Sequence, residues 1–370
     1  MKIMLVVSSM GNGGAERVAA TLVNAWAKRG DSVTLVITYS GRGSCFYPLS
    51  DKVRCIYLAD LVKQGARALR YLARFAALRS LIRNSDPDVV VSFLTNVNIS
   101  AILASRGLGI PVIACEHIDP SADGRSALLS LMCRFIYPSA SLLTLLTDNM
   151  VAPFKKMVPH VKRIEVVPNP LPDELLLLQP QVVEKGARRR LIAVGRLNTQ
   201  KQFDLLIAAF ATLSRDFADW DLWIWGEGPE RPSLEAQVTH LQIGHRVFLP
   251  GKTTTPWEEM SRSDAFVLSS RYEGLPMAML EGMALGLPTV AFDCRSGPRE
   301  LTRGGQDGLL VPPGDRQAMI DTLRRVMSDE SLRAELGRKA ADSVRQRYSA
   351  QAILRIWDGI FAQLGARTVQ

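Results

Sequence analysis

Short apolar runs alternate with amphipathic stretches along the whole chain of 370 residues. In the first half, the apolar runs predict strands at Lys2–Ser8, Ser32–Thr38, Asp88–Ser92, Pro111–Cys115, Leu142–Thr144 and Ile164–Val167. The stretches between them predict helices at about 15–29, 61–84, 125–136 and 148–156. Because these strands are apolar throughout, we expect parallel strands that helices cover on both faces.

The second half repeats the alternation. Its predicted strands are Leu191–Val194, Asp221–Trp225, Val247–Leu249, Ala265–Leu268, Thr289–Phe292 and Leu309–Val311. Its predicted helices lie at about 202–215, 231–241, 276–285, 315–327 and 330–346, with a last one over Ala350–Leu364. The pattern therefore predicts an α/β protein with two Rossmann-like, doubly wound parallel-sheet domains.

A proline-rich segment separates the two halves. Pro168-Asn-Pro-Leu-Pro172 and the polar residues after it predict a linker over 171–190, in which Arg188–Arg190 form a solvated flank of the next strand. We expect an N-terminal domain over 1–170, a C-terminal domain over 191–348 and a terminal helical segment over 349–370.

Composition adds a charge asymmetry to this picture. Residues 1–170 contain 20 Lys and Arg against 11 Asp and Glu, whereas residues 171–370 contain 25 of each, so the net charge of +9 lies in the first half. A basic half predicts a polyanion or an anionic membrane surface as its partner. The five cysteines form no CxxC pair, which is typical of reduced thiols in the cytoplasm. The sequence contains no uninterrupted run of 18 apolar residues, so we predict no membrane-spanning helix.

Glycine-rich loops follow several predicted strands, where open parallel sheets bind their ligands. They are Gly11-Asn-Gly-Gly-Ala-Glu-Arg17, Val194–Lys201, Gly226-Glu-Gly-Pro229 and Leu249-Pro-Gly-Lys252. The first is no dinucleotide fingerprint, because Glu16 stands where a third glycine is needed. These loops let a phosphate, sugar or base approach the backbone, although each is equally compatible with a plain turn.

Charged residues on two of these strand ends favour a nucleotide sugar. Arg196 and Lys201 share one loop and suit a diphosphate. Glu273-Gly-Leu-Pro-Met-Ala-Met-Leu-Glu281 places two carboxylates around a helix that should begin near Pro276, and a helix start binds anions. Phosphate on the helix and hydroxyls on both carboxylates would fit this arrangement. The alternative is a solvated helix with surface glutamates.

The sequence offers few candidate residues for metal binding or for histidine chemistry. Asp86-Pro-Asp88 and Asp219-Trp-Asp221 precede strands, so we read them as turn residues and predict no metal site. Of the four histidines, only His117 follows a strand end and is expected to face the site. The others, at 160, 240 and 245, are expected on the surface.

Taken together and in order, these motifs resemble the retaining GT-B glycosyltransferases of family 4. The likeness covers nearly the whole chain and is carried by Gly13-Gly-Ala-Glu-Arg17, Val194-Gly-Arg-Leu197 with Lys201, Gly226–Pro229 and Glu273–Glu281. It implies a cleft between two Rossmann-like domains, a final helix that crosses back to the first domain, and metal-independent transfer with retention. The same architecture serves nucleotide-sugar 2-epimerases, which remain an alternative.

The resemblance also implies roles for single residues. Glu273 would contact the donor sugar near its anomeric carbon, Glu281 would bind the ribose, and His117 would touch the sugar from the other domain. Further donor contacts would come from Gly13, Gly14, Arg196, Lys201, Gly226, Leu249, Gly274, Pro276 and Met277. Arg196 and Lys201 would hold the diphosphate.

A basic stripe marks one predicted helix of the first half. Lys63, Arg67, Arg70 and Arg74 fall within about 60° of one another on a helix, over about 16 Å, while Leu69, Leu72 and Phe75 can pack inward. The stripe resembles the basic helix of bacterial N-acetylgalactosaminyltransferases that grip an undecaprenyl diphosphate acceptor in N-glycan assembly. Exopolysaccharide galactosyltransferases look similar. A polyprenyl-diphosphate-linked glycan and an anionic membrane are therefore the expected partners.

Three hypotheses follow from the sequence. The first is a retaining hexosyl or N-acetylhexosaminyl transferase that uses a UDP-sugar and no metal at the cytoplasmic membrane face. The second is the epimerase, and the third is a non-catalytic polyanion binder, which leaves Glu273 and Glu281 without a role. We expect no nucleic-acid partner.

Overall fold

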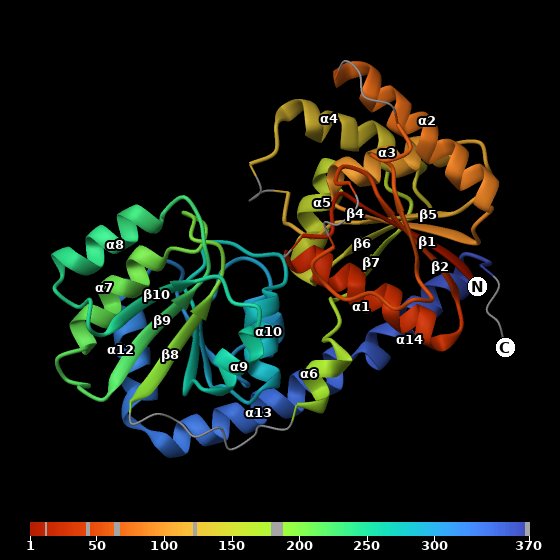
Figure 1. The fold of residues 1–370 in the computed structure, drawn as a ribbon. Helices are drawn as coiled ribbons and strands as arrows, with labels where there is room; N and C mark the ends of the chain where they lie inside the picture. The colour runs from red at the N-terminus through yellow and green to blue at the C-terminus, as the bar shows by residue number, and fades with distance from the viewer. Residues whose placement is uncertain (12, 42–44, 63–66, 121–123, 179–187, 367–370) are drawn as a thin grey trace. The chain divides into compact units, whose positions relative to one another are not determined.

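The computed structural model describes residues 1–11, 13–41, 45–62, 67–120, 124–178 and 188–366. It divides into two compact units, of which unit 1 comprises Met1–Pro170 with Ala350–Gln370 and unit 2 comprises Leu171–Ser349 (Figure 1). Each unit is an α/β domain built on one parallel sheet, so the predicted pair of doubly wound domains is confirmed.

Seven strands form the sheet of unit 1 within the described residues, in the order β3-β2-β1-β4-β5-β6-β7. They are β1 (Lys2–Val7), β2 (Ser32–Ile37), β3 (Arg54–Tyr57), β4 (Val89–Phe93), β5 (Val112–Cys115), β6 (Leu142–Leu145) and β7 (Ile164–Val166). Strand order reverses between β1 and β4, which marks the point where such sheets bind ligands.

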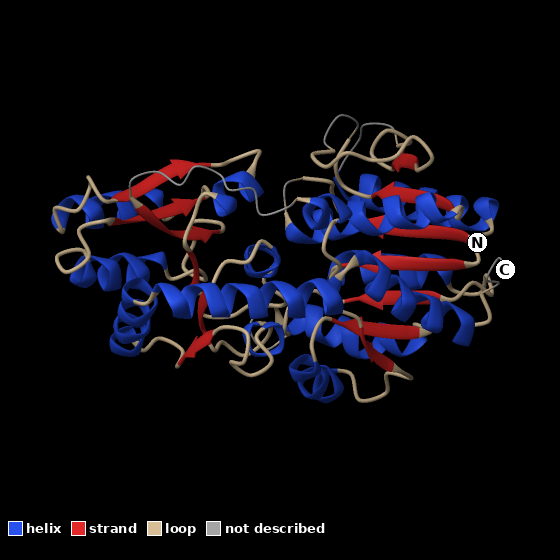
Figure 2. Cartoon of the chain, turned by 90° about the horizontal axis from the view of Figure 1, so that it is seen from below, coloured by secondary structure: helices blue, strands red, loops and turns tan. Residues whose placement is uncertain are grey.

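Helices cover both faces of this sheet, as its apolar strands require. They are α1 (Gly14–Arg29), α2 (Arg67–Ser85), α3 (Thr95–Ser105), α4 (Ala127–Ile136), α5 (Val151–Met157) and α14 (Ala350–Gln363), with short 3-10 helices at Tyr137–Ser139 and Asp148–Met150. Figure 1 shows α2, α3 and α4 on one face and α1 and α14 on the other. Figure 2 shows the strands side by side between these layers.

The last helix of the chain packs against the first. The Trp357 ring on α14 meets Trp26 on α1 edge to face, with ring centroids 5.7 Å apart. Asp358 pairs with Arg29 beside this contact. Both tryptophans are buried, so α14 is part of the core of unit 1 although 179 residues of unit 2 precede it.

Unit 2 holds six parallel strands among the residues that the structure describes, in the order β10-β9-β8-β11-β12-β13. They are β8 (Arg189–Val194), β9 (Trp220–Trp225), β10 (Val247–Gly251), β11 (Ala265–Leu268), β12 (Thr289–Phe292) and β13 (Leu309–Val311). Here the order reverses between β8 and β11. The carboxyl ends of these two strands therefore form the expected ligand position of unit 2.

The helices of unit 2 form two layers around its sheet. They are α6 (Asp173–Leu177), α7 (Phe203–Leu213), α8 (Arg231–His240), α9 (Pro256–Ser261), α10 (Met277–Ala284), α11 (Pro298–Leu301), α12 (Arg316–Ser328) and α13 (Glu330–Tyr348). Buried residues of α7, α8 and α12, such as Phe210, Leu234 and Leu323, pack with Trp220 and Leu222 of the sheet into one core. On the other face α10 contacts α9 and α13.

Two elements of unit 1 were not predicted. Helix α3 is buried on almost every side, including Val97, Asn98, Ala101 and Ile102, so it lacks the polar face that a 3.6-residue period needs. Strand β3 has only four residues and lies at the edge of the sheet. Short apolar elements of both kinds give little periodicity to detect.

The predicted linker over 171–190 needs correction. Residues Asp173–Leu177 form α6, and β8 begins at Arg189, so Arg189 and Arg190 belong to a strand rather than to its flank. Residues 179–187 lie outside the described part of the chain. Three short helices, α6, α9 and α11, were also missed because four to six residues are too few to show a period.

Candidate active site

An ion pair lies at the carboxyl ends of β8 and β11, where the strand order of unit 2 reverses. The Lys201 ammonium donates to Oε1 of Glu273 over 2.6 Å. Both side chains are largely buried. Lys201 lies on the loop after β8 and Glu273 on the loop after β11, so the structure brings two of the predicted site residues together.

Three further hydrogen bonds fasten these two loops to each other. The Gln200 amide donates to the Tyr272 carbonyl over 2.8 Å, and the Ser269 hydroxyl donates to the Lys201 carbonyl over 2.7 Å. The Arg271 N–H donates to the Gln200 carbonyl over 2.8 Å. The Lys201–Glu273 pair therefore rests on a rigid support rather than on a single contact.

Glycines at the ends of β8 and β9 allow this edge to form. A Cβ on Gly195 would stand 2.9 Å from Cε of Lys201, whose side chain crosses it. A Cβ on Gly226, which has a φ of +151°, would collide with the Gly195 carbonyl oxygen. Glycine at position 226 thus lets the ends of β8 and β9 approach closely, and glycine at position 195 lets the Lys201 side chain lie against the backbone on its way to Glu273.

Helix α10 begins beside Glu273 and presents its N-terminus. Pro276 is the N-cap residue, so the helix begins one residue later than predicted and runs from Met277 to Ala284. Among the described residues, no side chain caps this end by a hydrogen bond, so the first N–H groups are available to an anion. The Ser296 hydroxyl donates to the Gly274 carbonyl over 3.0 Å and fixes the turn before the helix.

Glu281 points into the protein from the second turn of α10. Its side chain is only 3% exposed, and its Oε2 accepts a hydrogen bond of 3.0 Å from the Trp257 indole. Trp257 lies on α9 and was not singled out in the sequence. In the sequence, Trp257 is marked only as an aromatic residue directly after Pro256, which begins the helix. It lies 24 residues before Glu281, and a separation of that length does not predict a contact.

The remaining donor-site candidates of unit 2 surround this edge. Arg196 is exposed on the loop after β8. Gly226 lies at the end of β9, where its N–H donates to the Gly251 carbonyl over 2.8 Å. The Leu249 carbonyl accepts from Arg231 over 3.0 Å. Arg231 also binds Glu227 over 2.9 Å, so these contacts hold the turn after β9 against the end of β10, to which Leu249 and Gly251 belong.

His117 occupies the corresponding edge of unit 1, after β5. Its ring packs against Phe93 of β4 at 4.5 Å, and the side chain is buried. Burial lowers the pKa of His117 to about 4, so the ring is neutral at physiological pH. Its Nε2 has no hydrogen-bond partner within the described residues, and such a buried polar atom is available to a ligand.

A buried polar cluster lies next to His117. The Glu116 carboxylate accepts hydrogen bonds from Tyr137 and from Thr95, the latter over 2.9 Å, and pairs with Arg125 at 3.4 Å. Burial raises the pKa of Glu116. The cluster ties the ends of β4 and β5 to the start of α4. Sequence patterns could not reveal it, because its members are scattered over 42 positions, from 95 to 137.

The glycine-rich loop of unit 1 leads into α1 as expected. Gly13 is the N-cap residue and Gly14 the first residue of the helix. The Glu16 carboxylate lies against Gly13 and accepts a hydrogen bond of 3.0 Å from Ser9. An anion at this helix start would therefore have to displace the Glu16 side chain.

The predicted basic stripe is only partly described. Lys63 lies outside the described residues, and Arg67 is the first residue of α2, whose side chain is not described. Arg70 is exposed, and the Arg74 guanidinium lies over the Tyr39 ring at 5.9 Å. The expectation that Leu72 packs inward is wrong, since this side chain is 66% exposed.

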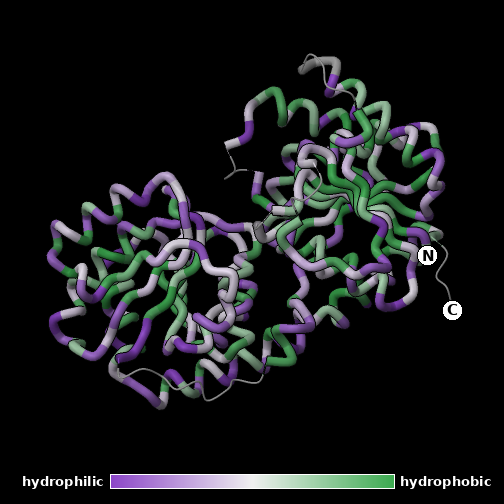
Figure 3. The backbone as a smooth tube through the Cα atoms, viewed as in Figure 1, coloured by the Kyte–Doolittle hydropathy of each residue, from purple (hydrophilic) through white to green (hydrophobic). Residues whose placement is uncertain are grey.

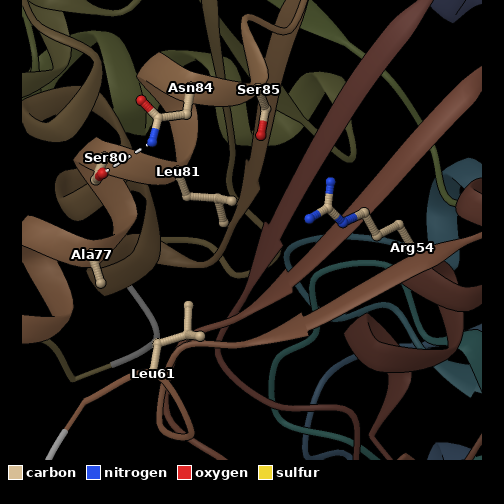
Figure 4. Close-up of a pocket in the computed structure, with 7 residues that line it drawn as sticks. All are labelled: Arg54, Leu61, Ala77, Ser80, Leu81, Asn84 and Ser85. Atoms are coloured by element: carbon tan, nitrogen blue, oxygen red, sulfur yellow. Dashed lines mark hydrogen bonds between the residues drawn. The ribbon is translucent and has the colours of Figure 1, made fainter.

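A hollow with a volume of about 430 Å³ lies elsewhere on unit 1 (Figure 4). It follows the outer edge of β3, between Arg54 on the strand side and the helix residues Ala77, Ser80, Leu81, Asn84 and Ser85, with Leu61 closing one end. It does not adjoin the carboxyl ends of β1 and β4, so its position does not match that of a ligand site in such a sheet.

Acidic pairs at the amino ends of strands have structural partners. Asp221 binds Arg188 over 2.8 Å and Arg246 over 3.0 Å, and Asp88 accepts from the Lys2 N–H over 2.7 Å. Across the described residues, no group of three or more His, Cys, Asp or Glu side chains could hold a metal ion. All five cysteines are free, and burial raises the pKa of Cys115 and of Cys294 to about 12.

Comparison with known proteins identifies the family. A model of the glycosyl transferase 4-like domain matches residues 13–170, and a model of glycosyl transferases group 1 matches residues 178–343. The chain belongs to these glycosyltransferases. The matches leave only short segments at the ends and around the predicted linker uncovered, so this glycosyltransferase has both domains of its family.

Curated relatives share the full length of the glycosyltransferase. The amylovoran biosynthesis glycosyltransferase AmsD of Erwinia amylovora is 28% identical over 97% of this chain and 99% of its own. An N-acetylgalactosaminyltransferase of Campylobacter jejuni, named for an undecaprenol-diphosphate-linked acceptor, is 29% identical over 91% of both chains. An exopolysaccharide phosphotransferase of Streptomyces coelicolor is 27% identical, but this chain spans only 40% of it.

Solved structures agree on the fold. The Anabaena HepE structure, a complex with UDP, superposes with a TM-score of 0.81 over 98% of this chain and 100% of that one, at 18% identity. The glycosyltransferase therefore has the GT-B fold that its sequence motifs indicated. Within the described ranges, none of its helices combines the length and apolar character that crossing a bilayer needs.

Proposed function

We propose that this glycosyltransferase transfers a hexose or N-acetylhexosamine, with retention at the anomeric carbon, from a UDP-sugar to an undecaprenyl-diphosphate-linked oligosaccharide. The reaction would take place at the cytoplasmic face of the membrane, without a metal ion, in the synthesis of a bacterial surface polysaccharide or glycan. Two relatives support this proposal: AmsD is named for amylovoran biosynthesis, and the Campylobacter jejuni enzyme is named for a glycan linked to undecaprenol diphosphate.

The observation that carries the proposal is the Lys201–Glu273 pair at the reversal point of the unit 2 sheet, next to the free N-terminus of α10. A cation and a helix start side by side suit the diphosphate of a nucleotide sugar. Glu273 can then accept hydrogen bonds from sugar hydroxyls. Glu281, about one turn beyond the start of α10, suits the ribose hydroxyls.

Arg196 and Lys201 would stabilise the charge that develops on the departing diphosphate. In a front-face displacement, an acceptor hydroxyl oxygen forms the new bond to the anomeric carbon. The bond from that carbon to the β-phosphate oxygen breaks on the same face, and the acceptor proton passes to the released phosphate oxygen. This route requires no protein nucleophile and no acid–base pair of carboxylates.

The ion pair prepares Lys201 for this role. Before the donor binds, Glu273 balances the buried ammonium and keeps it extended across Gly195. On donor binding, the diphosphate would take over the contact with Lys201 and release a Glu273 oxygen for the sugar. In unit 1, the neutral His117 ring, whose Nε2 has no partner within the described residues, would be available to a sugar hydroxyl.

Substitution of the two cations tests the donor site. We expect Lys201→Ala and Arg196→Ala to reduce transfer by roughly 10²-fold or more each, because each removes a charged group from the developing phosphate charge. Arg215→Ala, which removes another exposed arginine of unit 2, serves as the matched control. Full activity of both site variants would refute the donor assignment.

A donor panel tests the reaction itself. Incubation with UDP- and GDP-sugars and a synthetic polyprenyl-diphosphate glycan, followed by mass spectrometry, should show one added hexose or N-acetylhexosamine from a UDP donor. Anomeric configuration follows by NMR. If UDP-N-acetylglucosamine without acceptor yields its 2-epimer, the epimerase hypothesis replaces the proposal.

A further inference from the structure

Helix α4 carries an apolar stripe on its outer face. Leu128, Leu131, Met132 and Phe135 are 68%, 51%, 38% and 72% exposed. At 100° per residue they fall within an arc of about 100°. Figure 3 colours most of this helix as hydrophobic. Four neighbouring large apolar side chains in water form the kind of patch that marks an interaction surface.

The stripe belongs to a well-formed helix with a separate inner face. The Ser126 hydroxyl caps its start by accepting from the Leu129 N–H over 3.2 Å. Cys133, on the side opposite the stripe, is fully buried, and Tyr137 directly after the helix is buried in the Glu116 cluster. The core of unit 1 is therefore filled without the four stripe residues, which leaves them available for a partner.

The helices around α4 define the charge of this face. α3 contacts both α2 and α4, and α4 contacts α5. No acidic residue occurs within α2, α3, α4 or α5. Exposed basic side chains stand on three of them, namely Arg70 on α2, Arg134 on α4, and Lys155 and Lys156 on α5. Asp148, in the 3-10 helix directly before α5, is an exposed acidic residue near them. The four helices themselves thus carry exposed basic side chains and no acidic ones around the apolar stripe.

An apolar helix face surrounded by basic helices favours one kind of partner over another. Two copies of the chain joined through α4 would bring like charges together, which opposes self-association. An anionic lipid bilayer satisfies both properties, because its headgroups attract basic side chains and its acyl boundary accepts an apolar helix face. One apolar helix plus a basic surface also supplies the two signals that stable peripheral binding needs.

We propose that α4 is the membrane-inserting element of this protein and lies in the surface of an anionic bilayer with Leu128, Leu131, Met132 and Phe135 among the acyl chains. Arg70, Arg134, Lys155 and Lys156 bind the headgroups around it. The biological reason for this contact rests on the proposed function, since a lipid-linked acceptor is reached at a membrane. The assignment adds an apolar contact on α4 to the predicted basic stripe of α2.

Vesicle sedimentation tests the proposal with the full chain. Binding is measured to phosphatidylcholine vesicles with and without phosphatidylglycerol, for the unaltered protein and for Leu128→Gln with Phe135→Gln. The matched control is Leu177→Gln, which removes an exposed leucine (81%) from α6 of unit 2. Circular dichroism and thermal melting confirm that all three proteins are folded.

We expect the unaltered protein and the control to bind the anionic vesicles and to bind pure phosphatidylcholine more weakly. The double variant should lose about tenfold or more in its partition coefficient, since two large apolar side chains no longer leave water. Equal binding of the double variant, or no binding of the unaltered protein to either vesicle, overturns the proposal. A dimer of the unaltered protein that the double variant abolishes would overturn it in favour of self-association.

One more measurement separates this proposal from the transferase reaction. Transfer by the unaltered protein to a water-soluble, short-chain prenyl-diphosphate acceptor is assayed without vesicles. If the protein binds vesicles but does not transfer sugar to this acceptor, the proposed function is refuted and the role of α4 stands. Successful transfer with no vesicle binding would refute the role of α4 alone.

Discussion

Glu273 and Glu281 lie on one short segment, yet each has a different partner. Glu273 faces the Lys201 ammonium, whereas Glu281 is deep in the protein and accepts from the neutral Trp257 indole. A carboxylate that faces a cation can exchange that cation for a ligand, while one held by an indole keeps its place. The two residues are therefore suited to a mobile and a fixed part of the same donor site.

The Trp257 contact predicts a specific loss of donor affinity. Trp257→Phe removes a hydrogen bond to a carboxylate, worth about 1.5–3 kcal/mol, so UDP should bind roughly tenfold or more weakly. Isothermal titration calorimetry measures this change. Trp223→Phe is the control, because the Trp223 indole N–H has no hydrogen-bond partner in the described part of the chain. Equal weakening by both variants would assign the effect to packing.

The buried His117 predicts a pH-dependent stability. Its pKa of about 4, lowered by burial, lies below the ordinary value of 6.5. The unfolded chain therefore binds more protons between these values, and stability falls as pH falls through this range. Between pH 7 and pH 5, proton binding by His117 in the unfolded chain lowers the free energy of unfolding by about 2 kcal/mol.

Urea unfolding of His117→Asn at both pH values isolates this term. The variant should lose about 2 kcal/mol less than the unaltered protein, and His160→Asn, on the surface, should behave like the unaltered protein. The raised pKa of nearby Glu116 acts in both proteins and largely cancels in the comparison. An identical pH dependence of His117→Asn and the unaltered chain would contradict the assignment.

At the scale of elements, α14 completes unit 1 through Trp357. This side chain is buried against Trp26 and Phe361, so Trp357→Ala should cost about 3–5 kcal/mol of unfolding free energy. Ile356→Ala, on the exposed side of the same helix, should cost about 1 kcal/mol or less. Urea denaturation followed by circular dichroism measures both. A small effect of Trp357→Ala would show that α14 is dispensable for the unit.

The position of ligand sites at the carboxyl ends of parallel strands explains why most of the candidate donor site could be located from the sequence. Lys201, Glu273 and the start of α10 follow apolar strands that are plain in the sequence, and parallel strands bring their carboxyl ends to one edge. Trp257, α3 and the Glu116 cluster could not be predicted, because their contacts depend on tertiary packing. Leu72 was misplaced because a helix with one basic face was assumed to hide its apolar residues.

At the scale of the molecule, the two units differ in charge and in predicted task. Unit 2 carries the ion pair, the α10 helix start and Glu281, so UDP alone should bind there. Hydrogen exchange should show the strongest protection by UDP in the peptides that cover Arg196–Lys201 and Met277–Glu281. Peptides that cover α4, which has no part in the proposed donor site, serve as the reference. No protection at either loop would contradict the donor site.

The position of α14 at the end of the chain has a consequence for biosynthesis. The first 170 residues leave the ribosome before the 179 residues of unit 2 are made, and only then does α14 appear. At about 5–20 residues per second this delay amounts to roughly 10–35 s. During that time Trp26 and the rest of the α1 face that α14 covers stay exposed to water. The core of unit 1 is therefore complete only after unit 2 and α14 have both been translated.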